Sequence, residues 1–74
     1  MRIEYSKHAR KRMRERNVTD RDVRRMFHER GAAHPSPKKR TLRGRTLGGA
    51  PLEVVYTEER RQEFRIVTVK LPSR

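Results

Sequence analysis

Residues 52–71 read LEVVYTEERRQEFRIVTVKL, and this stretch decides the fold. It holds two apolar runs, LEVVYT at residues 52–57 and EFRIVTVKL at residues 63–71, separated by the polar segment EERRQ. β-Branched and aromatic residues favour strands, and a short polar segment between two such runs favours a chain reversal. The stretch therefore predicts two strands joined by a turn that includes Glu58 and Glu59.

The segment before this hairpin predicts one more strand. KKRTLRGRTL, at residues 38–47, is basic and ends at Gly48-Gly49, which is a strong turn signal. No acidic residue occurs from Ala32 to Leu52, and the segment opens with AAHPSP, whose two prolines break regular structure. A loop followed by a basic strand is the expected structure here.

The first part of the chain predicts a short strand and then a helix. Residues 2–5 alternate as a strand does, and Ser6 suits the N-cap of a helix that runs to about Arg16. Asn17 suits the left-handed position that follows a helix.

A second helix is predicted to begin at Thr19 and to end at Gly31. Asp20 and Asp22 lie in its first turn, where the helix dipole favours negative charge. Val23, Met26 and Phe27 form its apolar stripe. The element order is then β-α-α-β-β-β.

This order predicts an α+β fold in which the two N-terminal helices pack on one face of a small antiparallel sheet. With 74 residues, the chain has room for one hydrophobic core, so residues 1–74 are expected to form a single domain. Only 31% of the residues are hydrophobic, so we expect a partner, or a second copy in a homodimer, to cover part of the surface.

A formal net charge of +12 indicates a polyanionic partner, most simply nucleic acid. The chain has no cysteine, no apolar run long enough to cross a membrane and no visible signal peptide. These absences predict a cytoplasmic protein without membrane association.

The first predicted helix holds the strongest candidate for chemistry. Helical spacing places His8 and Arg12 next to each other, beside a narrow apolar stripe of Ala9 and Met13. The helix dipole and nearby guanidinium groups disfavour a charged imidazole, so His8 is expected to be neutral and able to accept a proton. A histidine that only packs at the helix edge, or caps a loop, would fit the same pattern.

Other motifs are less informative. Simple alternation along the last strand gives two mixed faces, Phe64, Ile66, Thr68 and Lys70 on one, and Arg65, Val67, Val69 and Leu71 on the other. Thr68 is either an ordinary strand residue or a hydroxyl that holds a phosphate oxygen. No Cys or His pair has metal-ligand spacing, and we expect no metal and no cofactor.

HARKRMRERNVTDRDV at residues 8–23, followed after a loop by LEVVYTEERRQEFRIVTV at residues 52–69, resembles a family of small bacterial domains that open with His-Ala-Arg-X-Arg-Met. That family is similar to BrnT-type toxins and, more distantly, to RelE-like toxins, in the fold group of barnase and the colicin ribonucleases. Asn17 stands where the family usually has glycine, and asparagine tolerates the left-handed conformation.

The resemblance implies a metal-independent endoribonuclease of toxin–antitoxin type, with RNA and an acidic antitoxin as partners. In such a reaction a base removes the proton of the 2′-hydroxyl, and that oxygen attacks phosphorus. His8 would be the base or acid, and the catalytic set would be His8, Arg12 and Thr68. The phosphate would be held or oriented by Arg43, Arg45, Arg65 and Tyr56.

Two other functions fit the same residues. One is a non-catalytic nucleic-acid-binding module, and the other is a small subunit of a ribonucleoprotein assembly. A helix-turn-helix is disfavoured, because strands follow the two helices and the second helix lacks base-reading Asn or Gln.

Overall fold

The computed structural model describes residues 1–30 and 34–72, and three of its strands form an antiparallel unit. These are β2 (Ser36–Arg45), β3 (Pro51–Arg60) and β4 (Glu63–Lys70). Gly49 has a φ of 89° in the β2–β3 turn, which glycine adopts without strain, so the predicted Gly48-Gly49 turn is confirmed. The β3–β4 turn is shorter than predicted, because β3 continues through Glu58 and Glu59 to Arg60.

The fourth strand, β1 (Arg2–Tyr5), pairs with β4 in the parallel direction. The strand order across the sheet is β1-β4-β3-β2. The sheet is therefore mixed, whereas the sequence predicted an antiparallel one. The parallel pairing follows from the connection, because parallel strands need a long crossover and the two helices with β2 and β3 supply it.

The first helix, α1 (Lys7–Glu15), begins where the sequence predicts it. The Ser6 hydroxyl accepts a hydrogen bond from the Ala9 N–H at 3.0 Å, and it donates one to the carbonyl oxygen of Val67 at 2.8 Å. One side chain thus caps α1 and ties it to β4. Asn17 follows the helix with a φ of 58°, so the predicted left-handed residue is confirmed.

The second helix, α2 (Asp20–Arg30), begins after a reciprocal cap. The Thr19 hydroxyl accepts from the Asp22 N–H at 3.2 Å, and the Asp22 carboxylate accepts from the Thr19 N–H at 2.8 Å. Asp22 also accepts from the Leu47 N–H at 2.8 Å, which joins α2 to the β2–β3 connection. The predicted helix end at Gly31, and the first two residues of the AAHPSP loop, lie outside the described residues.

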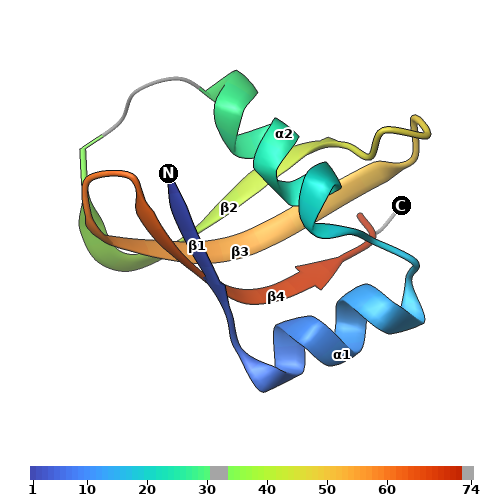
Figure 1. Cartoon of the computed structure of the whole chain (residues 1–74), viewed down its shortest axis with the longest axis horizontal. Coiled ribbons are helices and arrows are strands. Elements are labelled where there is room, and N and C mark those ends of the chain that lie inside the picture. The colour runs from blue at the N-terminus through green and yellow to red at the C-terminus, as the bar shows by residue number, and fades with distance from the viewer. Residues whose placement is uncertain (31–33, 73–74) are drawn as a thin grey trace.

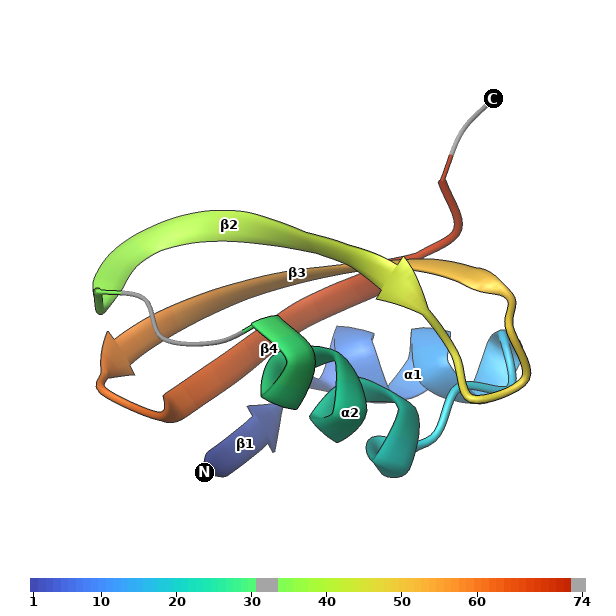
Figure 2. The ribbon, with the colours of Figure 1, turned by 90° about the horizontal axis from the view of Figure 1, so that it is seen from above.

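The helices and strands have the predicted order, and the predicted α+β class is confirmed. In Figure 1, α2 crosses in front of the sheet and α1 lies beside the end of β4. Seen from above in Figure 2, both helices lie on the same side of the sheet. No described helix covers the opposite side, and none is long and apolar enough to cross a membrane.

A β-bulge near Val67 decides which residues of β4 reach the core. Tyr56 pairs with Ile66, but the preceding residue Val55 pairs with Thr68, so β4 contains one extra residue at this point. Beyond the bulge the alternation is reversed, and Val69 is buried with Phe64 and Ile66. The predicted faces of β4 are therefore wrong after Ile66, because simple alternation does not allow for a bulge.

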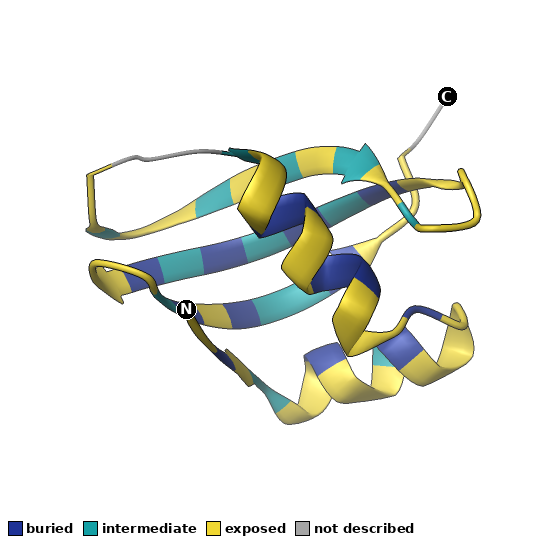
Figure 3. Ribbon diagram, turned by 45° about the horizontal axis from the view of Figure 1, so that its top comes forward, coloured by how far each residue is buried: buried dark blue, intermediate teal, exposed yellow. Residues whose placement is uncertain are grey.

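The core lies between the helices and one face of the sheet (Figure 3). The buried stripe of α2 is Val23, Met26 and Phe27, and α1 contributes Ala9 and Met13, as predicted. Side chains that do not face the helices remain partly or fully exposed on the other face of the sheet. We call this other face the open face.

Candidate nucleic-acid interface

The open face carries basic and hydroxyl-bearing side chains from all four strands. Directly paired strand residues point to the same face, so the register identifies its members. They are Arg2, Glu4, Thr41, Arg43, Arg45, Pro51, Glu53, Val55, Thr57, Arg60, Glu63, Arg65, Thr68 and Lys70. Three of the predicted phosphate-binding arginines and the predicted catalytic threonine are in this set.

Glu53 lies in the middle of the basic residues at one end of this face. Its carboxylate is 3.4 Å from the Arg43 guanidinium and 3.8 Å from the Lys70 ammonium. The Glu53 side chain is 12% exposed and that of Arg43 is 74% exposed, so the acid is covered while the arginine faces solvent. Arg43 is therefore oriented by Glu53 and can still contact an anion.

Arg45 and Arg65 lie toward opposite ends of the open face. Neither forms an ion pair with a residue that the structure describes, although the Arg45 guanidinium donates to the Gly49 carbonyl at 2.9 Å. Same-face residues on one strand are about 7 Å apart, and Arg45 and Arg65 are separated by several such steps and by β3. These two arginines cannot bind the same phosphate group.

Tyr56 lies on the covered face, so its predicted role in orienting phosphate is wrong. It is 3% exposed, and its ring packs against Phe27 and Phe64 with centroid distances of 4.7 Å and 5.9 Å. The cause is strand alternation, because Tyr56 has the same parity as the buried residues Leu52 and Val54. Its hydroxyl oxygen lies 3.5 Å from the Arg30 guanidinium, which donates to it.

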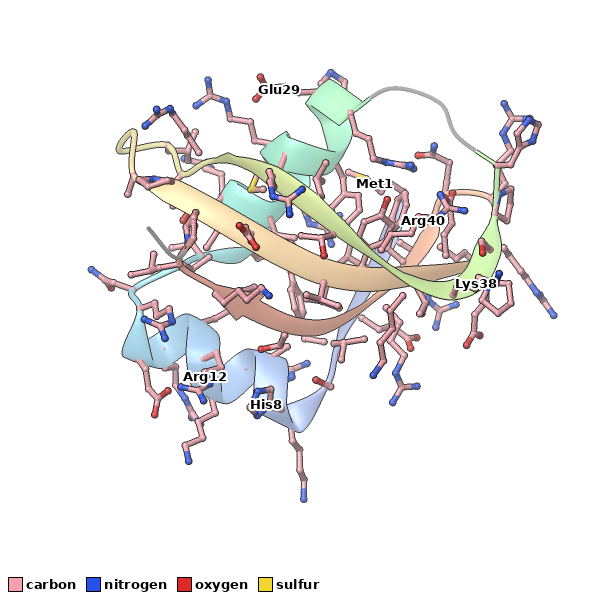
Figure 4. All side chains as sticks on the ribbon, turned by 180° about the vertical axis from the view of Figure 1, so that it is seen from behind. Met1, His8, Arg12, Glu29, Lys38 and Arg40 are labelled. Carbon is pink, nitrogen blue, oxygen red and sulfur yellow. The ribbon has the colours of Figure 1, made fainter. Side chains whose placement is uncertain are left out.

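His8 and Arg12 lie on the exposed side of α1. His8 is exposed, Arg12 is half-buried, and the Arg12 guanidinium is 3.3 Å from the Glu15 carboxylate. Viewed toward the open face in Figure 4, the two labelled side chains are neighbours on α1, below the sheet. The contact between Ser6 and Val67 fixes this end of α1 against β4, one residue before Thr68.

The seven predicted residues therefore fall into three places. His8 and Arg12 are on α1, while Arg43, Arg45, Arg65 and Thr68 are spread over the open face, and Tyr56 is in the core. The hollow between α2 and β2 has a volume of about 440 Å³ and is not lined by His8 or Thr68. The arrangement is an extended basic surface rather than a closed catalytic cleft.

Residues 5–70 match the protein family described as a domain of unknown function, DUF4258. The chain belongs to the DUF4258 family. The matched region contains both helices, strands β2 to β4 and all seven predicted site residues. Searches of curated proteins and of solved structures find no match to this DUF4258 domain.

A buried ion pair that the sequence did not predict joins Arg30 of α2 and Glu58 of β3 in this DUF4258 domain. The guanidinium and the carboxylate are 3.2 Å apart, and the two side chains are 10% and 0% exposed. Glu58 continues the buried series Leu52, Val54 and Tyr56, so the period of two was the signal that could have found it. Its position beside Glu59 made it resemble a polar turn residue.

Charge pairing at the start of α2 lowers the pKa of Asp20. The Tyr5 hydroxyl and the Arg24 guanidinium both donate hydrogen bonds to its carboxylate. Burial alone would raise the pKa of Asp20, but these hydrogen bonds outweigh that effect and the pKa lies below its ordinary value. Burial and the hydrogen bond to Asp20 raise the pKa of Tyr5, so the phenol stays protonated.

Across residues 1–30 and 34–72, no group of three or more His, Asp or Glu side chains is arranged to hold a metal ion. Glu53 is paired with Arg43 and Lys70, and Glu58 is paired with Arg30. The chemistry that this surface offers is therefore contact with anions by guanidinium, ammonium and hydroxyl groups.

Proposed function

We propose that this DUF4258 domain binds RNA through the open face of its sheet. The observation that carries the proposal is the segregation of side chains by the sheet. Apolar residues lie under the helices, whereas Arg43, Arg45, Arg65 and Thr68 lie on the face that no described helix covers. A net charge of +12 supports attraction to a polyanion over the whole molecule.

The spacing of the arginines favours contacts to successive phosphate groups of one strand. Side chains several steps apart on a sheet reach different phosphates, and such contacts depend on charge more than on base sequence. Base stacking contributes little here, because Phe27, Tyr56 and Phe64 are buried and Tyr5 is half-buried. We therefore expect binding that is strongly salt-dependent and weakly sequence-specific.

The binding proposal is tested with fluorescence anisotropy of a labelled single-stranded RNA in a salt series. Arg65→Ala should weaken binding and reduce the slope of log K against log salt by about 0.7, the value for one phosphate contact on a single strand. Arg21→Ala is the matched control, because Arg21 is an exposed arginine of α2, away from the open face. Equal effects of the two substitutions would contradict a binding surface on the sheet.

Metal-independent endoribonuclease activity is a second proposed function, favoured by the position of His8 and Arg12. His8 is exposed next to Arg12, at the end of α1 that Ser6 joins to β4. His8 would take the proton of a 2′-hydroxyl, and that oxygen would attack the adjacent phosphorus. The bond to the 5′-oxygen then breaks and that oxygen takes a proton from water, which leaves a 2′,3′-cyclic phosphate and a 5′-hydroxyl, while Arg12 stabilises the added negative charge.

Cleavage is tested by incubating the protein with RNA in EDTA and analysing the ends of the products. His8→Ala should abolish cyclic-phosphate ends, and His28→Ala, an exposed histidine of α2, should leave them unchanged. A substrate with a single 2′-deoxy nucleotide at the cleavage site should resist cleavage. If the wild-type protein binds RNA but never cuts it, the nuclease proposal is excluded and the binding proposal remains.

The resemblance to toxins extends the proposal to a cytoplasmic toxin that an acidic antitoxin keeps inactive. An acidic partner would neutralise part of the basic surface that the open face displays. Expression alone should then arrest growth, and co-expression with the partner should restore it. A subunit of a ribonucleoprotein assembly, the other candidate, should be harmless when it is expressed alone.

A further inference from the structure

Within residues 1–30 and 34–72, no strand pairs with the outer edge of β2. β2 is the last strand of the order β1-β4-β3-β2, and its inner edge pairs with β3. An edge strand presents a row of backbone N–H and C=O groups that another extended chain can pair with. Proline and lysine often blunt such edges, and here Pro37, Lys38 and Lys39 occupy only the first part of the strand. The segment from Arg40 to Arg45 stays open to pairing.

A groove runs along this open segment, between β2 and α2. Its volume is about 440 Å³, and apolar side chains on its floor are Met26, Leu42 and Leu47. Leu42 is half-buried and Leu47 is 47% exposed, so both retain apolar surface that this chain does not cover. Gly44 allows the Met26 side chain to pack closely against β2, because a Cβ atom there would lie 3.1 Å from it.

The register of β2 shows that the two faces of an added strand would meet different side chains. Leu42 and Gly44 pair with buried residues and face the groove, whereas Arg43 and Arg45 face the open side. A strand paired with this edge would place every second side chain over the groove and the others beside the two arginines. Arg25, Glu29 and Arg30 of α2 also line the groove, but Arg25 is paired with Glu29 and Arg30 with Glu58. The positive charge that remains for a partner is that of Arg43 and Arg45, which also line the groove.

We propose that the outer edge of β2 binds an acidic peptide as a fifth strand of the sheet, with apolar and acidic residues in alternation. The apolar side chains would cover Leu42 and Leu47, and the carboxylates would pair with Arg43 and Arg45. A second copy of this chain is disfavoured, because pairing two β2 edges would bring Arg43 and Arg45 of both copies to the same face of one sheet, where like charges repel. Nucleic acid offers no extended peptide backbone for the edge and no aliphatic side chain for the groove.

The test uses a short fluorescent peptide of alternating Glu and Val, with anisotropy and amide chemical shifts as readouts. The peptide should bind and shift the amides of Arg40 to Leu47. Two versions carry N-methyl groups on alternate residues, one version for each edge of the peptide. One of them should lose binding and the other should keep it, since only one peptide edge can pair with β2.

Two further comparisons separate strand pairing from simple charge attraction. A peptide with the same composition, but with its Glu and Val residues in two blocks, should bind at least about tenfold more weakly, a loss of about 1.4 kcal/mol. Arg43→Glu should weaken the alternating peptide by at least about tenfold. Arg61→Glu makes the same charge change in the β3–β4 turn and should leave the affinity unchanged.

Equal affinity for the alternating, blocked and both N-methylated peptides would overturn the proposal, because charge alone would then explain binding. If the protein forms a concentration-dependent dimer without peptide, and the amide chemical shifts of Arg40 to Leu47 change with it, the edge of β2 pairs with a second copy instead. If a single-stranded RNA changes the amide chemical shifts of Arg40 to Leu47 and the peptide does not, the edge of β2 binds nucleic acid instead. The inference is independent of the RNA proposal, since a protein that binds the peptide and no RNA would still support it.

Discussion

Arg30 and Glu58 show how a charged pair is accommodated in a small apolar core. The Arg30 guanidinium lies 5.0 Å from the ring centroid of Phe64 and 5.6 Å from that of Tyr56, and it is paired with Glu58. The second Glu58 oxygen accepts from the Gln62 N–H at 3.0 Å. The Arg30 Nε is buried without a hydrogen-bond partner among the described residues. The pair joins the end of α2 to β3 across three aromatic rings.

Removing one member of this pair should be much more damaging than replacing both. Glu58→Leu leaves a buried guanidinium without its counter-charge, and we expect a loss of about 3–5 kcal/mol in the free energy of unfolding. The double variant Arg30→Met with Glu58→Leu should recover most of that loss, because no uncompensated charge remains. Urea unfolding measures the free energy of unfolding of each variant. A double variant no more stable than the single variant would contradict this account.

Asp22 should make the stability of the protein depend on pH. Burial acts to raise the pKa of Asp22, but hydrogen bonds from Leu47 and Thr19 outweigh it and the pKa lies below its ordinary value. A lowered folded-state pKa means that the stabilisation is present above the unfolded value of about 3.9 and is lost as pH falls through the folded value. Asp22→Asn should lower stability near pH 7 by about 1–3 kcal/mol and should flatten its decrease below pH 5.

The measurement for Asp22 is urea unfolding followed by circular dichroism across this pH range. Glu15→Gln provides the control, because Glu15 is exposed and pairs only with Arg12 on the same helix. An acid-dependent loss of the same size in wild type and Asp22→Asn would show that other groups cause it.

At the scale of elements, local signals predicted what local interactions determine. Ser6, Asn17 and Thr19 mark helix boundaries because each side chain or backbone conformation acts within a few residues. The bulge at Val67 and the parallel partner of β1 depend on residues far apart in the chain, so no window of sequence contains them. The burial of Tyr56 is a local matter, because it follows the alternation of Leu52 and Val54, and the role implied by the resemblance did not take that alternation into account.

Asn17 offers a test of the turn between α1 and α2. Its φ of 58° is in the region that glycine adopts freely and that alanine adopts only with strain. Asn17→Gly should therefore leave stability unchanged or slightly higher, whereas Asn17→Ala should lower it by about 1 kcal/mol. Thermal unfolding of the two variants side by side measures the difference, and equal midpoints would argue against a left-handed residue at this position.

At the scale of the whole molecule, one sheet separates an apolar side from a basic side. The resemblance implied that Arg43, Arg45 and Arg65 would hold a phosphate, and all three are exposed on the open face. It did not predict their distribution over the open face, because that depends on strand order. The sequence also did not show how far His8 on α1 would lie from these arginines.

The net charge of +12 should make the folded protein more stable as salt is added. Like charges repel more strongly in the folded state than in the expanded unfolded chain, and salt screens this repulsion. A gain of about 1 kcal/mol would raise the midpoint of thermal unfolding by about 4–8 °C for a domain of this size. Thermal unfolding scans at a series of sodium chloride concentrations measure the shift of the midpoint. A midpoint that falls with salt would mean that surface pairs such as Arg25 with Glu29 outweigh the repulsion.

The contact between Ser6 and Val67 joins residues 61 positions apart, and β1 pairs with β4 beside it. Because translation proceeds from the N-terminus, β1 has no neighbouring strand until nearly all of the described chain has left the ribosome. Closing so long a loop is slow, and the strand edges stay exposed meanwhile. During its own synthesis this chain is therefore an incompletely folded polycation next to ribosomal RNA, and we expect it to depend on chaperones or early partners at that stage.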